Sequence, residues 1–124
     1  MRALGAELAR ELRRGDLVLL YGLLGTGKTT LVRGLLSELG VEDPVRSPTF
    51  NLVQLFDTDP PVAHIDLFRL ETSKGLGLED TFETHLVLIE WGDRLEARFG
   101  GAHAWRIRIT FEGEGRSVMI ERPD

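Results

Sequence analysis

The stretch from Gly22 to Thr30 carries the residue types and the spacing of a phosphate-binding loop. Gly22, Gly27, Lys28 and Thr29 satisfy the P-loop pattern G-x-x-x-x-G-K-[ST]. Glycines let the backbone turn tightly, so that successive N–H groups point at a phosphate, and the helix that follows adds its positive end. The lysine of such a loop reaches the β and γ phosphates, and the hydroxyl takes one position on Mg²⁺. Nucleotide contacts are therefore expected from Gly22, Gly25, Thr26, Gly27, Lys28, Thr29 and Thr30.

Hydrolysis at a P-loop also needs a carboxylate at the end of a neighbouring strand, to hold the metal's water shell or to polarise the attacking water. Two acids compete for this role. Glu90 follows the apolar run Leu86 to Ile89, the Walker-B layout of four apolar residues and an acid. Asp66 follows a less uniform run that includes His64. The alternative for either acid is a cap or a plain surface position.

Three further features have residue types that occur around the active sites of P-loop proteins. The segment Ser47-Pro48-Thr49-Phe50 is a proline-stiffened loop with two hydroxyls, as in switch segments that sense a γ-phosphate, although Ser-Pro-Thr is also a common turn. Trp91 follows Glu90 and is a candidate to pack at the nucleotide, the alternative being a core position. The strand position of His64 favours the role of a neutral, hydrogen-bonded residue over that of a general base.

A P-loop requires a strand before it and a helix after it, and the sequence supplies both. Asp16 to Tyr21 is almost uniformly apolar, which favours a central parallel strand covered on both faces. Lys28 to Leu39 repeats apolar residues at helical spacing and ends before Gly40. Ahead of them, Ala3 to Arg14 has the pattern of an amphipathic helix stopped by Gly15.

The remainder of the chain alternates between strands and turns. Strands are predicted over Asn51 to Phe56, Val62 to Leu67, Leu86 to Ile89, Trp105 to Phe111 and Ser117 to Glu121. Short helical stretches are predicted near Leu78 to Phe82 and Arg94 to Phe99. The strands Asn51 to Phe56 and Val62 to Leu67 are predicted to form one hairpin, and the last two strands another. These elements predict an α/β fold in a single domain, 1–124: a P-loop NTPase-like three-layer sandwich with a mainly parallel central sheet plus antiparallel hairpins.

Composition narrows the class of protein. The chain has 124 residues, 42% of them hydrophobic and 28% charged, as in ordinary soluble globular domains. It has no cysteine, so neither a disulfide framework nor thiolate chemistry is available, and a reducing cytoplasm is the expected location. A net charge of −5 argues against a protein that holds nucleic acid alone by neutralising phosphates. No apolar run approaches the length of a membrane span.

Four motifs in this order resemble the bacterial TsaE family, formerly YjeE. They are the loop with its preceding Leu20-Tyr21, the run Ser47 to Val53, the run His64-Ile65-Asp66-Leu67-Phe68-Arg69-Leu70, and Leu88-Ile89-Glu90-Trp91. The P-loop alone is shared by many families, whereas the combination is far more specific. The resemblance covers nearly the whole chain. It implies a compact ATPase that binds ATP or ADP with Mg²⁺ and helps to make threonylcarbamoyladenosine beside the anticodon of certain tRNAs.

The resemblance also implies partners and roles. TsaB and TsaD form the partner complex, TsaD transfers the threonylcarbamoyl group, and the TsaE-like subunit resets the complex by its ATPase cycle; contact with tRNA is expected to be indirect, and the isolated chain monomeric. The metal ligands are Thr29 and Glu90, and Trp91 lies near the nucleotide. The residues implied in catalysis are Lys28, Thr49, Asp66 and Glu90.

One position departs from the family in the loop itself. Leu23 stands where the family usually has Asp, in a variable position of the P-loop pattern, so phosphate binding is expected to survive. Any contribution that the family's Asp makes to turnover or to partner contact is not supplied by Leu23. A nucleotide-gated binding module with negligible hydrolysis is therefore the alternative to an ATPase.

Overall fold

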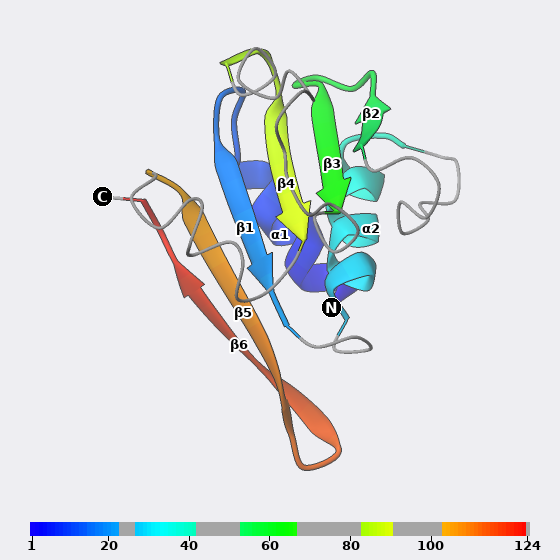
Figure 1. Cartoon of the computed structure of the whole chain (residues 1–124). Coiled ribbons are helices and arrows are strands. Elements are labelled where there is room, and N and C mark those ends of the chain that lie inside the picture. The colour runs from blue at the N-terminus through cyan, green and yellow to red at the C-terminus, as the bar shows by residue number, and fades with distance from the viewer. Residues whose placement is uncertain (23–26, 42–52, 67–82, 91–102, 124) are drawn as a thin grey trace.

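The computed structural model describes residues 1–22, 27–41, 53–66, 83–90 and 103–123. These residues form two helices and a six-stranded sheet (Figure 1). In chain order the elements are α1 (Arg2–Glu11), β1 (Leu17–Tyr21), α2 (Lys28–Glu38), β2 (Val53–Phe56), β3 (Val62–Asp66), β4 (Leu86–Glu90), β5 (Trp105–Glu112) and β6 (Gly115–Glu121). The expected helical stretches Leu78 to Phe82 and Arg94 to Phe99 lie outside the described residues.

The strand order across the sheet is β2-β3-β4-β1-β5-β6. The four central strands, β3, β4, β1 and β5, are parallel, and the two outer pairs, β2–β3 and β5–β6, are antiparallel. The predicted α/β class, the mainly parallel sheet and both hairpins are therefore confirmed. Because later strands flank β1 on both sides, the end of β1 is the kind of switch point at which open α/β sheets bind ligands.

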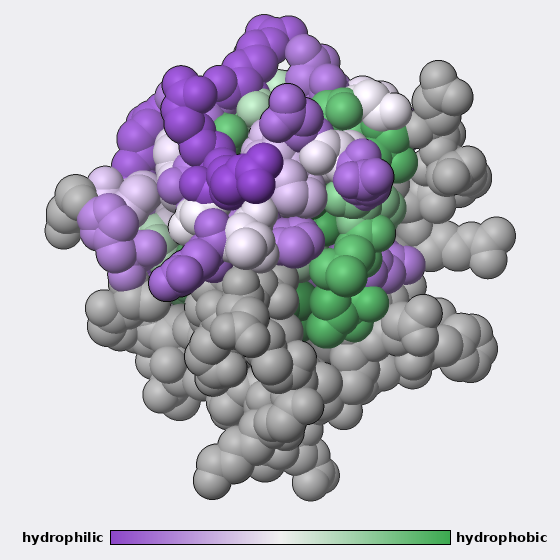
Figure 2. All heavy atoms as spheres, turned by 90° about the horizontal axis from the view of Figure 1, so that it is seen from above, coloured by the Kyte–Doolittle hydropathy of each residue, from purple (hydrophilic) through white to green (hydrophobic). Residues whose placement is uncertain are grey.

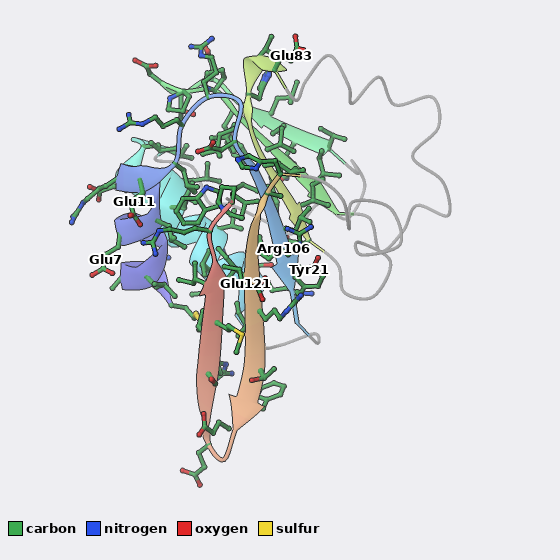
Figure 3. The ribbon with its side chains drawn as sticks, turned by 90° about the vertical axis from the view of Figure 1, so that its left-hand side faces the viewer. Glu7, Glu11, Tyr21, Glu83, Arg106 and Glu121 are labelled. Atoms are coloured by element: carbon green, nitrogen blue, oxygen red, sulfur yellow. The ribbon has the colours of Figure 1, made fainter. Side chains whose placement is uncertain are left out.

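The central strands β1, β3 and β4 are buried on both faces. On one face, α1 and α2 pack against the helix-side core, which includes Val18, Leu20 and Leu88. The opposite face carries a second cluster that includes Leu19 and Ile89, both fully buried. Figure 3 shows Tyr21 on the side of the sheet away from α1, whereas Glu7 and Glu11 project from the outer surface of that helix. The uniformly apolar strands of the sequence thus correspond to strands buried on both faces.

The first helix ends earlier than its sequence pattern predicts. Helix α1 ends at Glu11 instead of Arg14, because Leu12 adopts an extended conformation with φ −78° and ψ 145°. The Leu12 side chain is buried in the helix-side core, and the Asp16 carboxylate accepts a hydrogen bond from the Arg13 N–H at 2.8 Å. Neither described helix has the length and hydropathy needed to span a membrane.

The two ends of the sheet differ. Figure 2 views the end at which β1, β3 and β4 begin, where hydrophilic side chains cover much of the described surface. At the opposite end, the β5–β6 hairpin extends past the last residue of β1 (Figure 1), because β1 pairs only with Trp105 to Arg108 of β5. The carboxyl ends of the parallel strands lie beside the base of this projection, and the candidate site lies there.

Candidate nucleotide site

The P-loop begins and ends on well-packed elements. Residues Val18 to Tyr21 of β1 are buried, and Gly22 follows them directly. At the other end of the loop, Gly27 is the N-cap of α2 with φ 111°, a left-handed conformation that side chains disfavour. The carbonyl of Gly27 accepts the first helical hydrogen bond, from the N–H of Leu31 at 2.9 Å. The φ of Gly27 favours glycine here, and an added Cβ would also lie 3.0 Å from Cγ of the flexible Met1 side chain, which would have to move.

Lys28 connects the two ends of the loop. Its side chain is buried, with 8% of the residue exposed, although lysine is seldom buried without a partner. The ammonium Nζ donates a hydrogen bond to the carbonyl oxygen of Gly22 at 2.5 Å. An ammonium has three N–H donors, so this one bond leaves capacity for an anion at the same place. The geometry fits a lysine that reaches back across a phosphate loop.

Glu90 ends β4 next to the strand that carries the loop. In the parallel ladder Glu90 is in register with Leu20, just before Gly22. The Glu90 residue is 5% exposed, and alternation along β4 puts it on the same face as Leu88, the face that α2 covers. Of the two competing acids, Glu90 is therefore the one in the strand adjacent to β1, and it lies on the face of the sheet that α2 covers.

A buried histidine is the partner of this acid. His64 of β3 is fully buried, and its Nε2 shares a hydrogen bond with Oε2 of Glu90. His64 is in register with Leu88, so it lies diagonally opposite Glu90 on the same face of the sheet. The expectation of a hydrogen-bonded strand histidine is confirmed, but its partner was not predicted. Its second ring nitrogen, Nδ1, is buried and finds no hydrogen-bond partner in the part of the chain that the structure describes.

Asp66 ends β3 in register with Glu90. The carboxyl ends of β3, β4 and β1 thus bring the backbones of Asp66 and Glu90 to one edge, beside the strand that leads to Gly22; the structure describes no side-chain position for Asp66. In the first turn of α2, Thr29 and Thr30 are half-buried. The other expected site residues, Gly25, Thr26, Thr49 and Trp91, lie outside the described residues, as does Leu23.

The oxygen ligands available at this site suit a cation such as Mg²⁺ that is held mainly by a nucleotide. Within the described ranges, no group of three or more histidine, aspartate or glutamate side chains is arranged to hold a metal by itself. Mg²⁺ in phosphate sites typically takes one or two protein oxygens, with phosphates and waters completing its shell. A threonine hydroxyl at the start of α2 and a carboxylate at the end of β4 match that requirement.

Two relatives with similar sequences carry the same protein name. A protein known as tRNA threonylcarbamoyladenosine biosynthesis protein TsaE from Streptomyces coelicolor is 43% identical over 100 residues, which are 75% of this chain and 68% of the relative. The protein of that name from Mycobacterium tuberculosis is 34% identical over 113 residues, 81% of this chain and 67% of its own length.

Structural and family comparisons agree with these relatives. The crystal structure of YdiB from Bacillus subtilis superimposes with a TM-score of 0.77 at 26% identity, over 96% of this chain and 75% of that one. The fold is accordingly that of a P-loop NTPase-like α/β protein. The family model described as threonylcarbamoyl adenosine biosynthesis protein TsaE matches residues 1–118. The chain belongs to the TsaE family.

Proposed function

We propose that this protein binds ATP and ADP with Mg²⁺ at the carboxyl ends of β1 and β4 and hydrolyses ATP in support of threonylcarbamoyladenosine formation on tRNA. One observation carries the proposal: buried Glu90 lies in register with Leu20, immediately before the loop that Lys28 spans. A P-loop next to a strand-terminal carboxylate is the arrangement that phosphoryl transfer to water requires. Membership of the TsaE family supports the assignment to threonylcarbamoyladenosine biosynthesis.

Each residue of the loop has a distinct task in this proposal. Lys28 exchanges or shares its Gly22 contact for the β and γ phosphates, while the backbone N–H groups from Gly25 to Thr30 surround them. The hydroxyl of Thr29 and a carboxylate oxygen of Glu90 hold Mg²⁺, directly or through its waters. Mg²⁺ held by these groups would neutralise the charge that develops on the transferred phosphoryl group. Enclosure of Lys28 and Glu90 strengthens these electrostatic contacts, because little water screens them.

The periphery of the site follows from the family motifs. Thr49 senses the γ-phosphate or its metal, Asp66 orients the attacking water or the metal's water shell, and Trp91 packs against the nucleotide. We expect slow hydrolysis by the chain alone, because the sequence pattern does not identify an arginine finger that would stabilise the transferred phosphoryl group. A partner therefore completes or triggers the reaction.

The partner in this proposal is a TsaB–TsaD complex in the cytoplasm. The chain acts as a monomer that binds this pair, and its hydrolysis cycle returns the complex to a state ready for another transfer. Its net charge of −5 is unfavourable for independent binding to the tRNA backbone, so contact with tRNA is indirect.

The experiment is phosphate release by the purified chain, alone and with the TsaB–TsaD pair. Slow release alone and faster release with the pair is the expected result, and Lys28→Ala removes both. If ADP binds but no phosphate appears under either condition, the protein is a nucleotide-gated binding module and the ATPase proposal is wrong. If neither ATP nor ADP binds, the nucleotide site itself is wrong.

A further inference from the structure

His64 and Glu90 belong to two different family motifs, and the sequence motifs assign no function to a contact between them. The two residues lie 26 positions apart in the chain and meet only because β3 and β4 are parallel neighbours. The side chain of His64 is 0% exposed and that of Glu90 6% exposed. A polar pair at this depth needs its hydrogen bond, because a buried polar group that loses its partner keeps an uncompensated desolvation cost.

The environment of the ring indicates which nitrogen carries the proton. Among the described residues, Nδ1 of His64 has no hydrogen-bond partner, whereas Nε2 faces Oε2 of Glu90. A neutral imidazole has one N–H donor and one acceptor nitrogen. A buried N–H without an acceptor is rarer and more costly than an acceptor without a donor. The favoured arrangement therefore has Nε2–H donating to Glu90, with Nδ1 as the unpaired acceptor.

We propose that His64 is a positioning residue for Glu90. Its Nε2–H occupies Oε2 and holds the carboxyl group in one orientation, which leaves Oε1 as the oxygen that serves Mg²⁺ or its water shell. The inference rests on the proposed function, because it assigns Glu90 to the metal. It extends that function by one residue, which acts through Glu90 and touches neither nucleotide nor metal.

The physical reason is the cost of orienting a flexible side chain. A glutamate has several rotatable bonds, and fixing such a side chain in one orientation costs conformational entropy. A hydrogen bond from the rigid, fully buried ring of His64 meets part of this cost before the metal arrives. Partners that orient metal ligands in this way typically change metal affinity by about 10- to 100-fold when removed.

Three substitutions separate the donor from the bulk of the ring. In His64→Gln, the amide nitrogen lies the same number of bonds from Cβ as Nε2, so the donor to Glu90 is kept. In His64→Asn, the amide reaches only the place of Nδ1, and in His64→Leu no donor remains. ADP affinity is measured by calorimetry with Mg²⁺ and with a chelator, and Mn²⁺ binding to the ADP complex by electron paramagnetic resonance.

His64→Leu and His64→Asn are expected to weaken metal binding to the ADP complex by about 10- to 100-fold, whereas metal-free ADP affinity stays within about twofold. His64→Gln is expected to stay within about threefold of the wild type. In a Glu90→Gln background, His64→Leu should add no further loss of metal affinity, whereas a purely structural effect would add in both backgrounds. Equal losses in the Gln and Leu variants would overturn the donor role.

A second measurement needs no substitution at His64 and no nucleotide. Nitrogen-15 spectra of the free wild-type protein should show the Nε2–H form of the His64 ring, with a signal that shifts in Glu90→Gln; the Nδ1–H form would overturn the inference. The outcomes also separate the two proposals. A wild type without metal-dependent ADP affinity refutes the proposed function. A wild type with such affinity, matched by His64→Leu, refutes only the role of His64.

Discussion

Gly5 of α1 lies against the backbone of Leu31 in α2, so closely that an added Cβ would be 2.0 Å from the Leu31 carbonyl oxygen. Gly34 of α2 makes the reciprocal contact, where a Cβ would lie 2.1 Å from the carbonyl oxygen of Arg2. These glycines let the two helix backbones approach more closely than any side chain permits. Since α2 begins at Lys28, the contact helps to fix the end of that helix that is proposed to bind phosphate.

Gly5→Ala should therefore destabilise the fold. Helix propensity alone predicts a gain of about 1 kcal/mol for this change, but the clash is with backbone atoms that cannot rotate away. Overpacking of this kind costs about 1–3 kcal/mol or more, so the free energy of unfolding should fall in urea denaturation. Ser37→Ala, at an exposed position of α2, is the control and should change stability little. A Gly5→Ala protein as stable as the wild type would contradict the close approach.

Lys28→Ala should abolish detectable binding of ATP with Mg²⁺ in calorimetry. The change removes the positive charge that spans the loop and the hydrogen bond to Gly22. Arg33→Ala is the matched control, because it removes a cation from an exposed position of the same helix. Tight binding by the Lys28 variant would show that the loop is not the phosphate site.

Glu90→Gln should lower the hydrolysis rate by about 100-fold or more while ADP affinity without metal changes little. The amide keeps the size of the side chain but removes the negative charge at the end of β4. Steady-state phosphate release and calorimetry with a chelator give the two quantities. Glu112→Gln, at the exposed end of β5, is the control. A larger effect on metal-free ADP binding than on turnover would assign Glu90 to nucleotide affinity instead.

Asp66→Asn should reduce partner-stimulated hydrolysis by at least about tenfold, because Asp66 is in register with Glu90 at the carboxyl ends of adjacent strands. The assay is phosphate release with the TsaB–TsaD pair present. Asp57→Asn changes an exposed aspartate in the turn between β2 and β3 and should behave as the wild type. Unchanged stimulation in Asp66→Asn would leave this acid with a structural role only.

Local sequence patterns were sufficient to predict some features of the fold and of the candidate site. The strand, loop and helix around Lys28 are predictable because each depends on neighbours in the chain, and Glu90 because it follows four apolar residues. The partnership of Glu90 with His64 was not predictable, since it depends on the register of β3 with β4. The end of α1 at Glu11 was missed for a similar reason: burial of Leu12 in the core outweighs a helical pattern that continues.

The central claim is that Lys28, Thr29 and Glu90 together hold a nucleotide with Mg²⁺. A crystal structure with a non-hydrolysable ATP analogue and Mg²⁺ tests it most directly. We expect the β and γ phosphates against the ammonium of Lys28, with Mg²⁺ at about 2.1 Å from the Thr29 hydroxyl and from either Glu90 or a water that Glu90 holds. A nucleotide bound away from α2, or an ion with no contact to Glu90 even through water, would contradict it.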